Sequence, residues 1–233
     1  MSGALQAVFQ NQRSFGEPLP TVIGQAYGGG FYAGQIAVGG GGTATHYLIV
    51  SPKASGEASK KWKNVGTDTP GAGSLIDGPQ NTADMVADGS STVYPAAHFC
   101  NDLVIGGYTD WYMPAKNELE VCYYFLKNVT QNNSTSTGYF ITAGANANAV
   151  SPEPISTNYT TSSPAQTSAT AFQVGNSEAF INGTYWTSSD AGAVYPGTEE
   201  VWAQSWFDGD PGKQFIYGKA TSFNVRAVRR VAV

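Results

Sequence analysis

The sequence predicts an α+β domain made of two helices, antiparallel strands and long loops. Compact strand patterns occur near both ends of the chain, and two segments with helical apolar spacing lie between them. A stretch rich in Asn, Ser and Thr, which has no clear periodicity, separates the helices from the last strands. Each of these segments is considered below in chain order.

Residues 1–20 are expected to form an extended peptide that docks on a partner. Val8 and Phe9 are apolar, but the segment is otherwise polar and closes with Gly16, Pro18 and Pro20. A disordered tail is the alternative interpretation. The remaining residues, 21–233, are expected to form one domain, because their number fits one large domain.

The first half of this domain shows strand signals followed by a loop. Residues 22–51 have strand patterns that glycines interrupt, and residues 46–50 (HYLIV) form a compact apolar strand that Pro52 ends. Residues 53–80 are expected to be a loop in which Trp62 is the one large anchor.

Two helices are predicted in the middle of the chain. The first lies near residues 94–104 and ends before Gly106-Gly107. Its apolar face comprises Ala97, Cys100, Leu103 and Val104. The second begins after residues 110–114 and continues to Leu126, because Pro114 suits a first helical turn and Asp110 can cap it.

The remainder is predicted to be a long loop and then strands. Residues 128–184 are expected to be an elaborate loop insertion with a few short strands. The strand segments after it are residues 185–189, 201–207, 215–217 and 225–231, with a turn at residues 208–212.

The composition excludes several classes of function. Charged residues make up only 12% of the chain, and the net charge is −5, so binding to nucleic acid is not expected. No apolar run approaches the ~18 residues of a membrane span, and no secretory signal is recognisable. Assembly in the cytoplasm without membrane insertion is therefore expected. Cys100 and Cys122 are interpreted as buried free thiols or as a single bridge between the two helices.

Three motifs together resemble a known family. Residues 106–114 (GGYTDWYMP), followed by Asn117-Glu118-Leu119, resemble the GGY–DWR–LPT–EL signature of the DUF1566 family, also described as the C-terminal domain of a Legionella collagen-like adhesin. Residues 185–189 (YWTSS) and 225–229 (VRAVR) resemble its YWSS and VRCVR strands. The resemblance covers about residues 94–230 and implies a C-type-lectin-like fold. The chain departs from the pattern at Tyr112, where Arg is frequent, and at Ala115, where Thr is common.

The first sixteen residues (MSGALQAVFQNQRSFG) resemble the opening of tailed-phage fibre and virion proteins. Such openings precede unrelated modules, which implies that residues 1–20 anchor the chain to other virion proteins. The resemblance implies a virion protein that is assembled in the host cytoplasm. By analogy with fibre proteins, a homo-oligomer such as a trimer is expected.

Candidate residues fall into a structural and a ligand-binding set. The structural set includes two tryptophans, which are large apolar side chains with one polar atom. Its members are Trp111, Pro114, Glu118, Trp186, Arg226 and Arg229. Aromatic and polar side chains suited to a surface ligand form the second set: Tyr195, Glu199, Glu200, Trp202, Trp206, Asp208 and Asp210. Because Trp202 and Trp206 are four residues apart on one strand face, filling the core is their alternative role.

No metal site, cofactor or catalytic centre is expected. Asp208-Gly209-Asp210 and Glu199-Glu200 are weak candidates for calcium, and a turn with solvated aspartates is favoured. Only His46 and His98 could act as histidine bases, and no nucleophile-elbow motif is present. The expected function is a non-catalytic phage tail-fibre or head-fibre protein that binds a bacterial receptor, either a glycan or a protein. A structural decoration protein is the alternative, and a glycan-degrading enzyme is a weaker third hypothesis.

Overall fold

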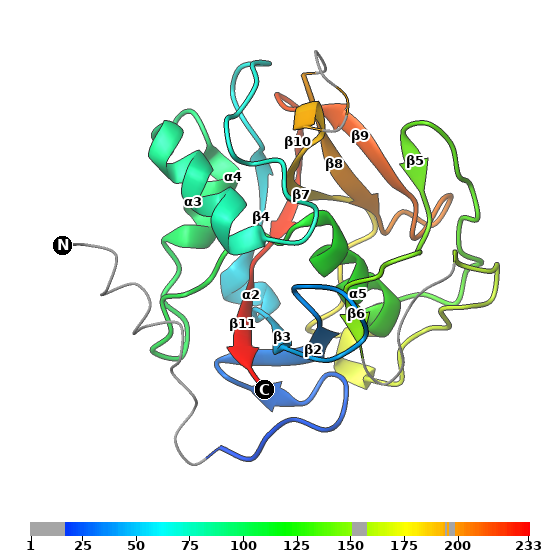
Figure 1. Cartoon of the computed structure of the whole chain (residues 1–233). Coiled ribbons are helices and arrows are strands. Elements are labelled where there is room, and N and C mark those ends of the chain that lie inside the picture. The colour runs from blue at the N-terminus through cyan, green and yellow to red at the C-terminus, as the bar shows by residue number, and fades with distance from the viewer. Residues whose placement is uncertain (1–16, 151–157, 194, 196–198) are drawn as a thin grey trace.

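The computed structural model describes residues 17–150, 158–193, 195 and 199–233, and these form an α+β fold with two β-sheets (Figure 1). Most of the predicted anchoring peptide therefore lies outside the described residues. The first sheet has the order β1-β2-β3-β11, and β6 also pairs with β2. Its strands are Ala26–Tyr27 (β1), Gly30–Ile36 (β2), His46–Val50 (β3), Val228–Ala232 (β11) and Ala149–Val150 (β6).

The second sheet has the order β4-β10-β7-β8-β9-β5. Its strands are Glu57–Lys61 (β4), Ser222–Arg226 (β10), Thr184–Asp190 (β7), Glu200–Ser205 (β8), Gln214–Gly218 (β9) and Ile141–Thr142 (β5). The pairing of β10 with β7 is parallel, and the other pairings within this sheet are antiparallel. The prediction of an α+β fold with antiparallel strands is thus confirmed.

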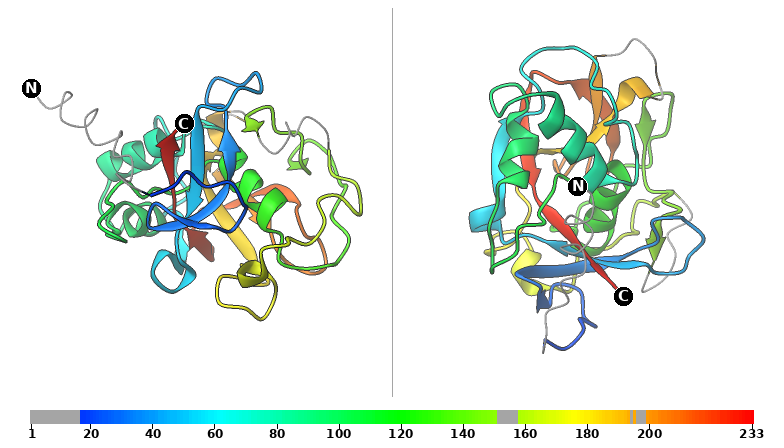
Figure 2. Two further views of the ribbon diagram at one scale, coloured as in Figure 1. Left: turned by 90° about the horizontal axis from the view of Figure 1, so that it is seen from below. Right: turned by 60° about the vertical axis from the view of Figure 1, so that its left-hand side comes forward.

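The described residues include helices and short 3-10 turns. The helices are α2 (Lys53–Gly56), α3 (Gly78–Asp88), α4 (Pro95–Asn101) and α5 (Lys116–Leu126), and the 3-10 turns are η1 (Thr170–Phe172) and η2 (Ala191–Ala193). Helix α5 lies between the sheets and contacts β2 on one side and β7 and β8 on the other (Figure 1). Helices α3 and α4 pack on each other and against β7, β4 and β10 (Figure 2). Because α5 is enclosed, nine of its eleven residues are buried.

Two antiparallel segments cross together from one sheet to the other. The chain runs from β3 through α2 into β4, and β10 runs into β11 beside it. Residues 225–231 were predicted as one strand, but Ala227 separates β10 from β11. The Ala227 N–H donates to the carbonyl of Gly56, and its carbonyl accepts from the N–H of Ser51. The backbone of Ala227 thus holds the two crossing segments together.

Several element boundaries differ from those predicted. Residues 53–80 contain α2, β4 and the start of α3 rather than a continuous loop. Strand β4 (EASKK) has no apolar alternation because it lies at the edge of the sheet, and α3 contains few apolar residues. Helix α4 ends at Asn101, so Val104 is 70% exposed and lies on no helical face. Helix α5 begins at Lys116, two residues after Pro114.

Candidate functional site

A groove of about 540 Å³ lies beside the last strands of the second sheet. Its walls combine phenylalanine rings with two carboxylates and one lysine. The lining residues are Phe140, Ile141, Thr184, Glu200, Ser205, Phe207, Asp210, Lys213, Phe215 and Ile216. Ligand-binding pockets usually measure ~300–1,000 Å³ and have mostly apolar walls with a few polar groups. This groove has both properties.

One wall of the groove is the loop at residues 206–213, which is fixed at both ends. Trp206 is fully buried at its start and stacks on Phe180, with 4.5 Å between ring centroids. At the other end, the N–H of Gly212 donates to the Ser205 carbonyl, and the Pro211 carbonyl accepts from the Ser134 N–H, each at 2.8 Å. Phe207 is 55% exposed on this fixed loop. Its ring is therefore presented to solvent without needing the loop to order first.

The charges in the groove do not cancel. Lys213 Nζ lies 2.7 Å from a carboxylate oxygen of Asp210 and 5.8 Å from the centre of the Phe215 ring. Glu200, by contrast, has neither an ion-pair nor a hydrogen-bond partner for its carboxylate within the described part of the chain. The described lining residues thus carry one uncompensated negative charge.

Three aromatic rings form a rim beside the groove. This aromatic rim consists of Tyr139, Phe140 and Tyr195, whose ring centroids lie 4.4 to 4.9 Å apart. The Tyr195 hydroxyl donates to the carbonyl of Tyr139 at 2.5 Å, while the Tyr139 ring is 73% exposed. Trp202 lies beneath the rim, 6.3 Å from the Tyr195 ring. Since Phe140 belongs to both, the rim extends the aromatic surface of the groove.

The structure separates the seven predicted ligand-binding residues. Glu200 and Asp210 line the groove, and Tyr195 lies in the aromatic rim. Glu199 instead lies against Gly66, and Asp208 accepts a hydrogen bond from the Asn182 side chain at 2.8 Å.

The two tryptophans of the predicted binding set fill the interior. Trp206 is fully buried in the core around α5, and Trp202 is buried with Ala191 and Ile216. Neither indole can meet a surface ligand, so their assignment as ligand-binding residues is wrong. The alternative role, filling the core, is the one that the structure shows.

Phe140, Phe207, Phe215 and Lys213 were missed as candidates. Phe140 belongs to the long loop insertion, where no periodicity marks it. The position of Phe207 on the surface could have been predicted from the strand pattern at residues 201–207. Successive side chains of an extended segment point in opposite directions, so a buried Trp206 places Phe207 on the other face.

A second, smaller depression contains the carboxylates of Asp68 and Asp190, and the second of these is held by contacts within the fold. It measures about 390 Å³ and is lined by small residues of the loop at 68–74 together with Asp190 and Gly192. Asp190 forms an ion pair with the buried Lys219 at 2.7 Å and accepts from the backbone N–H groups of Thr69 and Gly192. This carboxylate is therefore part of the scaffold.

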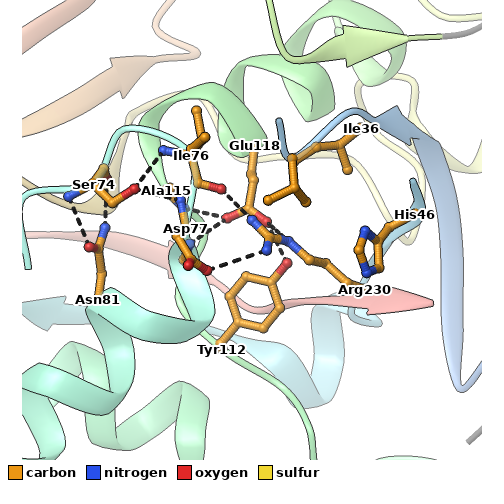
Figure 3. Close-up of polar contacts among 12 residues, drawn as sticks. Ile36, His46, Ser74, Ile76, Asp77, Asn81, Tyr112, Ala115, Glu118 and Arg230 are labelled. Carbon is orange, nitrogen blue, oxygen red and sulfur yellow. Dashed lines mark hydrogen bonds and ion pairs between the residues drawn. The ribbon is translucent and has the colours of Figure 1, made fainter. Parts of the chain in front are cut away.

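Glu118 is the centre of a buried polar network (Figure 3). Its carboxylate accepts from the N–H of Ala115 at 2.8 Å, the N–H of Gly78 at 3.2 Å and the hydroxyl of Tyr112. Arg230 Nε also donates to it at 2.8 Å. Burial raises the pKa of Glu118, and the charge of Arg230 opposes this shift. One side chain thus links the first turns of α3 and α5 with β11, and all these groups are mutually satisfied.

Two further arginines of the predicted structural set tie distant segments together. Arg226 is buried and donates to the Ser51 carbonyl at 2.8 and 3.0 Å and to the Glu178 carboxylate at 2.7 Å. Arg229 donates to both Asp110 oxygens, at 2.7 and 2.8 Å. The prediction that Asp110 caps the second helix is wrong, because α5 begins six residues later and Asp110 binds Arg229 instead.

The remaining members of the predicted structural set are Trp186, Trp111 and Pro114. Trp186 is fully buried and donates from Nε1 to the Lys60 carbonyl at 3.1 Å. Trp111 is 2% exposed, and its Nε1 has no partner in the described chain. Pro114 accepts a hydrogen bond from the Ser188 N–H at its carbonyl, outside the helix whose first turn it was predicted to occupy.

The remaining predictions concern the two cysteines, metal binding and membrane insertion. Cys100 and Cys122 are both buried and unbridged. Within the described ranges, no group of three or more His, Cys, Asp or Glu side chains could hold a metal ion. Asp208 accepts a hydrogen bond from Asn182, and Asp210 forms an ion pair with Lys213. None of the helices in the described residues is long and apolar enough to span a bilayer.

Comparison with family models, with curated proteins and with solved structures finds no match to the chain.

Proposed function

We propose that the chain is a non-catalytic virion protein of a tailed phage, and that its domain binds a receptor on the bacterial surface. The observation that carries this proposal is the groove, in which Glu200 and Asp210 lie with three phenylalanine rings on a fixed framework. Aromatic rings contribute large contact areas at low entropic cost, and carboxylates accept hydrogen bonds from ligands.

The virion location rests on the likeness of residues 1–16 to the openings of phage fibre proteins. The motifs at residues 106–119, 185–189 and 225–229 support a C-type-lectin-like domain of the DUF1566 type. In this proposal residues 1–20 attach the chain to other virion proteins, and a homo-oligomer such as a trimer multiplies weak receptor contacts through avidity.

The test is binding of the purified full chain to the bacteria that the encoding phage infects. Saturable binding that blocks phage adsorption is expected. The Phe207→Ala variant should lose this binding, whereas Tyr217→Ala should retain it, because Tyr217 is 46% exposed but does not line the groove. Absence of cell binding by the folded, assembled wild type would contradict the proposal.

Two parallel measurements separate the alternatives. Loss of particle stability in phage lacking the protein, without any loss of adsorption by the intact particles, would favour a decoration role. Release of reducing sugar from surface polysaccharide by the purified chain would favour an enzyme.

A further inference from the structure

The charge balance of the groove selects among ligands. Asp210 is neutralised by Lys213 at 2.7 Å. Glu200 is half-buried and has no partner for its carboxylate among the described residues. A ligand that enters the groove therefore meets one uncompensated negative charge, and a hydrogen-bond donor or a cation satisfies it best.

The aromatic walls favour the same kind of group. The faces of aromatic rings carry partial negative charge and attract ammonium groups. Lys213 already lies over the Phe215 ring, whereas Phe140 and Phe207 have no cationic side chain over their rings within the described chain. Phe207 in particular is 55% exposed. The exposed ring of Phe207 and the carboxylate of Glu200 thus remain for a cationic ligand.

On the basis of the proposed function, we infer that the groove binds a saccharide bearing a free amine. The ammonium group pairs with Glu200, and the apolar face of the sugar ring packs on Phe207 and Phe140. Acidic saccharides are disfavoured, because their carboxylates would face Glu200 and the ring faces, and Lys213 is already paired with Asp210.

Three soluble probes test this inference on the full chain by titration calorimetry at mildly acidic pH. They are an oligomer of glucosamine, the matching N-acetylglucosamine oligomer and an oligogalacturonate. The glucosamine oligomer should bind about tenfold more tightly than the acetylated one, because only its amines are charged. This preference should shrink as salt is added. Equal affinity of the two amino-sugar oligomers, or tighter binding of the oligogalacturonate, would overturn the inference.

Two pairs of variants assign the effect to the groove. Glu200→Gln should abolish the preference for the free amine, whereas Glu199→Gln should leave it unchanged, because Glu199 lies against Gly66 outside the groove. Phe207→Ala should weaken binding of both amino-sugar oligomers, and Tyr217→Ala should not. If a folded Glu200→Gln protein keeps the preference for the glucosamine oligomer, the inference is wrong.

The inference and the proposed function fail in different ways. If the wild type binds bacteria but shows no preference for the free amine, only the ligand class is wrong. If the wild type binds neither bacteria nor any probe, receptor binding itself is wrong.

Discussion

Glu118 and Arg230 form an ion pair inside the fold, with 2.8 Å between Oε1 and Nε. The glutamate side chain is fully enclosed, and that of the arginine is 11% exposed. Figure 3 shows both pointing into the junction of α3, α5 and β11. Burying two charges contributes little net stability, but removing one partner leaves the other uncompensated.

Replacing Arg230 should therefore destabilise the protein strongly. We expect Arg230→Met, which keeps much of the apolar stem, to lower the free energy of unfolding by about 3–5 kcal/mol. Urea denaturation measures this change. The exposed Lys61→Met is the matched control and should change stability by less than about 0.5 kcal/mol. Near-equal stabilities for the two variants would show that the ion pair does not organise the junction.

The lowered pKa of Lys116 makes one contribution to the pH dependence of stability in alkaline solution. Burial lowers its pKa to about 8, because the enclosed ammonium group loses its hydration, and the charge of Glu120 only partly opposes this shift. In the unfolded chain a lysine has a pKa of ~10.4, so between these values the native state has released a proton that the unfolded state keeps. The contribution of Lys116 to stability should therefore rise from about pH 8 to pH 10, by up to about 3 kcal/mol in total, as the cost of its buried charge disappears.

The Lys116→Met variant isolates this effect. It should be more stable than the wild type at neutral pH, and the difference between the two proteins should vanish as the pH approaches 10. Denaturant midpoints across this pH range provide the comparison, with Lys61→Met as the control. A constant difference across the range would be incompatible with a lowered lysine pKa.

The sequence allowed the class of fold to be predicted because its strongest patterns belong to the interior. The apolar strand at residues 46–50 and the helix ending at Leu126 are enclosed, so their hydrophobic periodicity is complete. Strand β4 and helix α3 were not predicted, because they bury few apolar side chains and so lack a clear hydrophobic pattern. One is a polar edge strand, and the other buries only Gly78, Asn81, Thr82 and Met85.

The candidate site was predicted only in part, because residue type does not determine direction. Trp206 and Phe207 are neighbours with similar chemistry, yet one fills the core and the other faces solvent. Glu199 and Glu200 likewise diverge, toward Gly66 and toward the groove. Phe140 joins them through the pairing of β5 with β9, a contact between residues more than seventy positions apart that no local pattern encodes.

The two cysteines should be unreactive in the native protein. Both thiols are fully buried, and burial raises their pKa values far above the ordinary range. Because the thiolate is the reactive form, a thiol reagent at about pH 8 should label neither cysteine without denaturant. Both should react after unfolding in guanidinium chloride, without a reducing agent. Failure of the unfolded chain to react would indicate a bridge.

Substitutions of Trp206 and of Phe207 should have different effects, the first on stability and the second on binding. Trp206 stacks on Phe180 and makes edge contacts with Tyr123 and Tyr185, at centroid distances of 5.2 and 4.9 Å. Trp206→Ala should therefore lower the free energy of unfolding by about 3–5 kcal/mol, because it leaves a large cavity in the core.

Phe207→Ala removes a ring that is 55% exposed, so it should change stability by less than about 1 kcal/mol while abolishing cell binding. Thermal unfolding and the bacterial binding assay should be run on both variants in parallel. If Phe207→Ala were as unstable as Trp206→Ala, its loss of binding would reflect unfolding. A stable Phe207→Ala protein that still binds cells would instead show that the receptor contacts another surface of the domain.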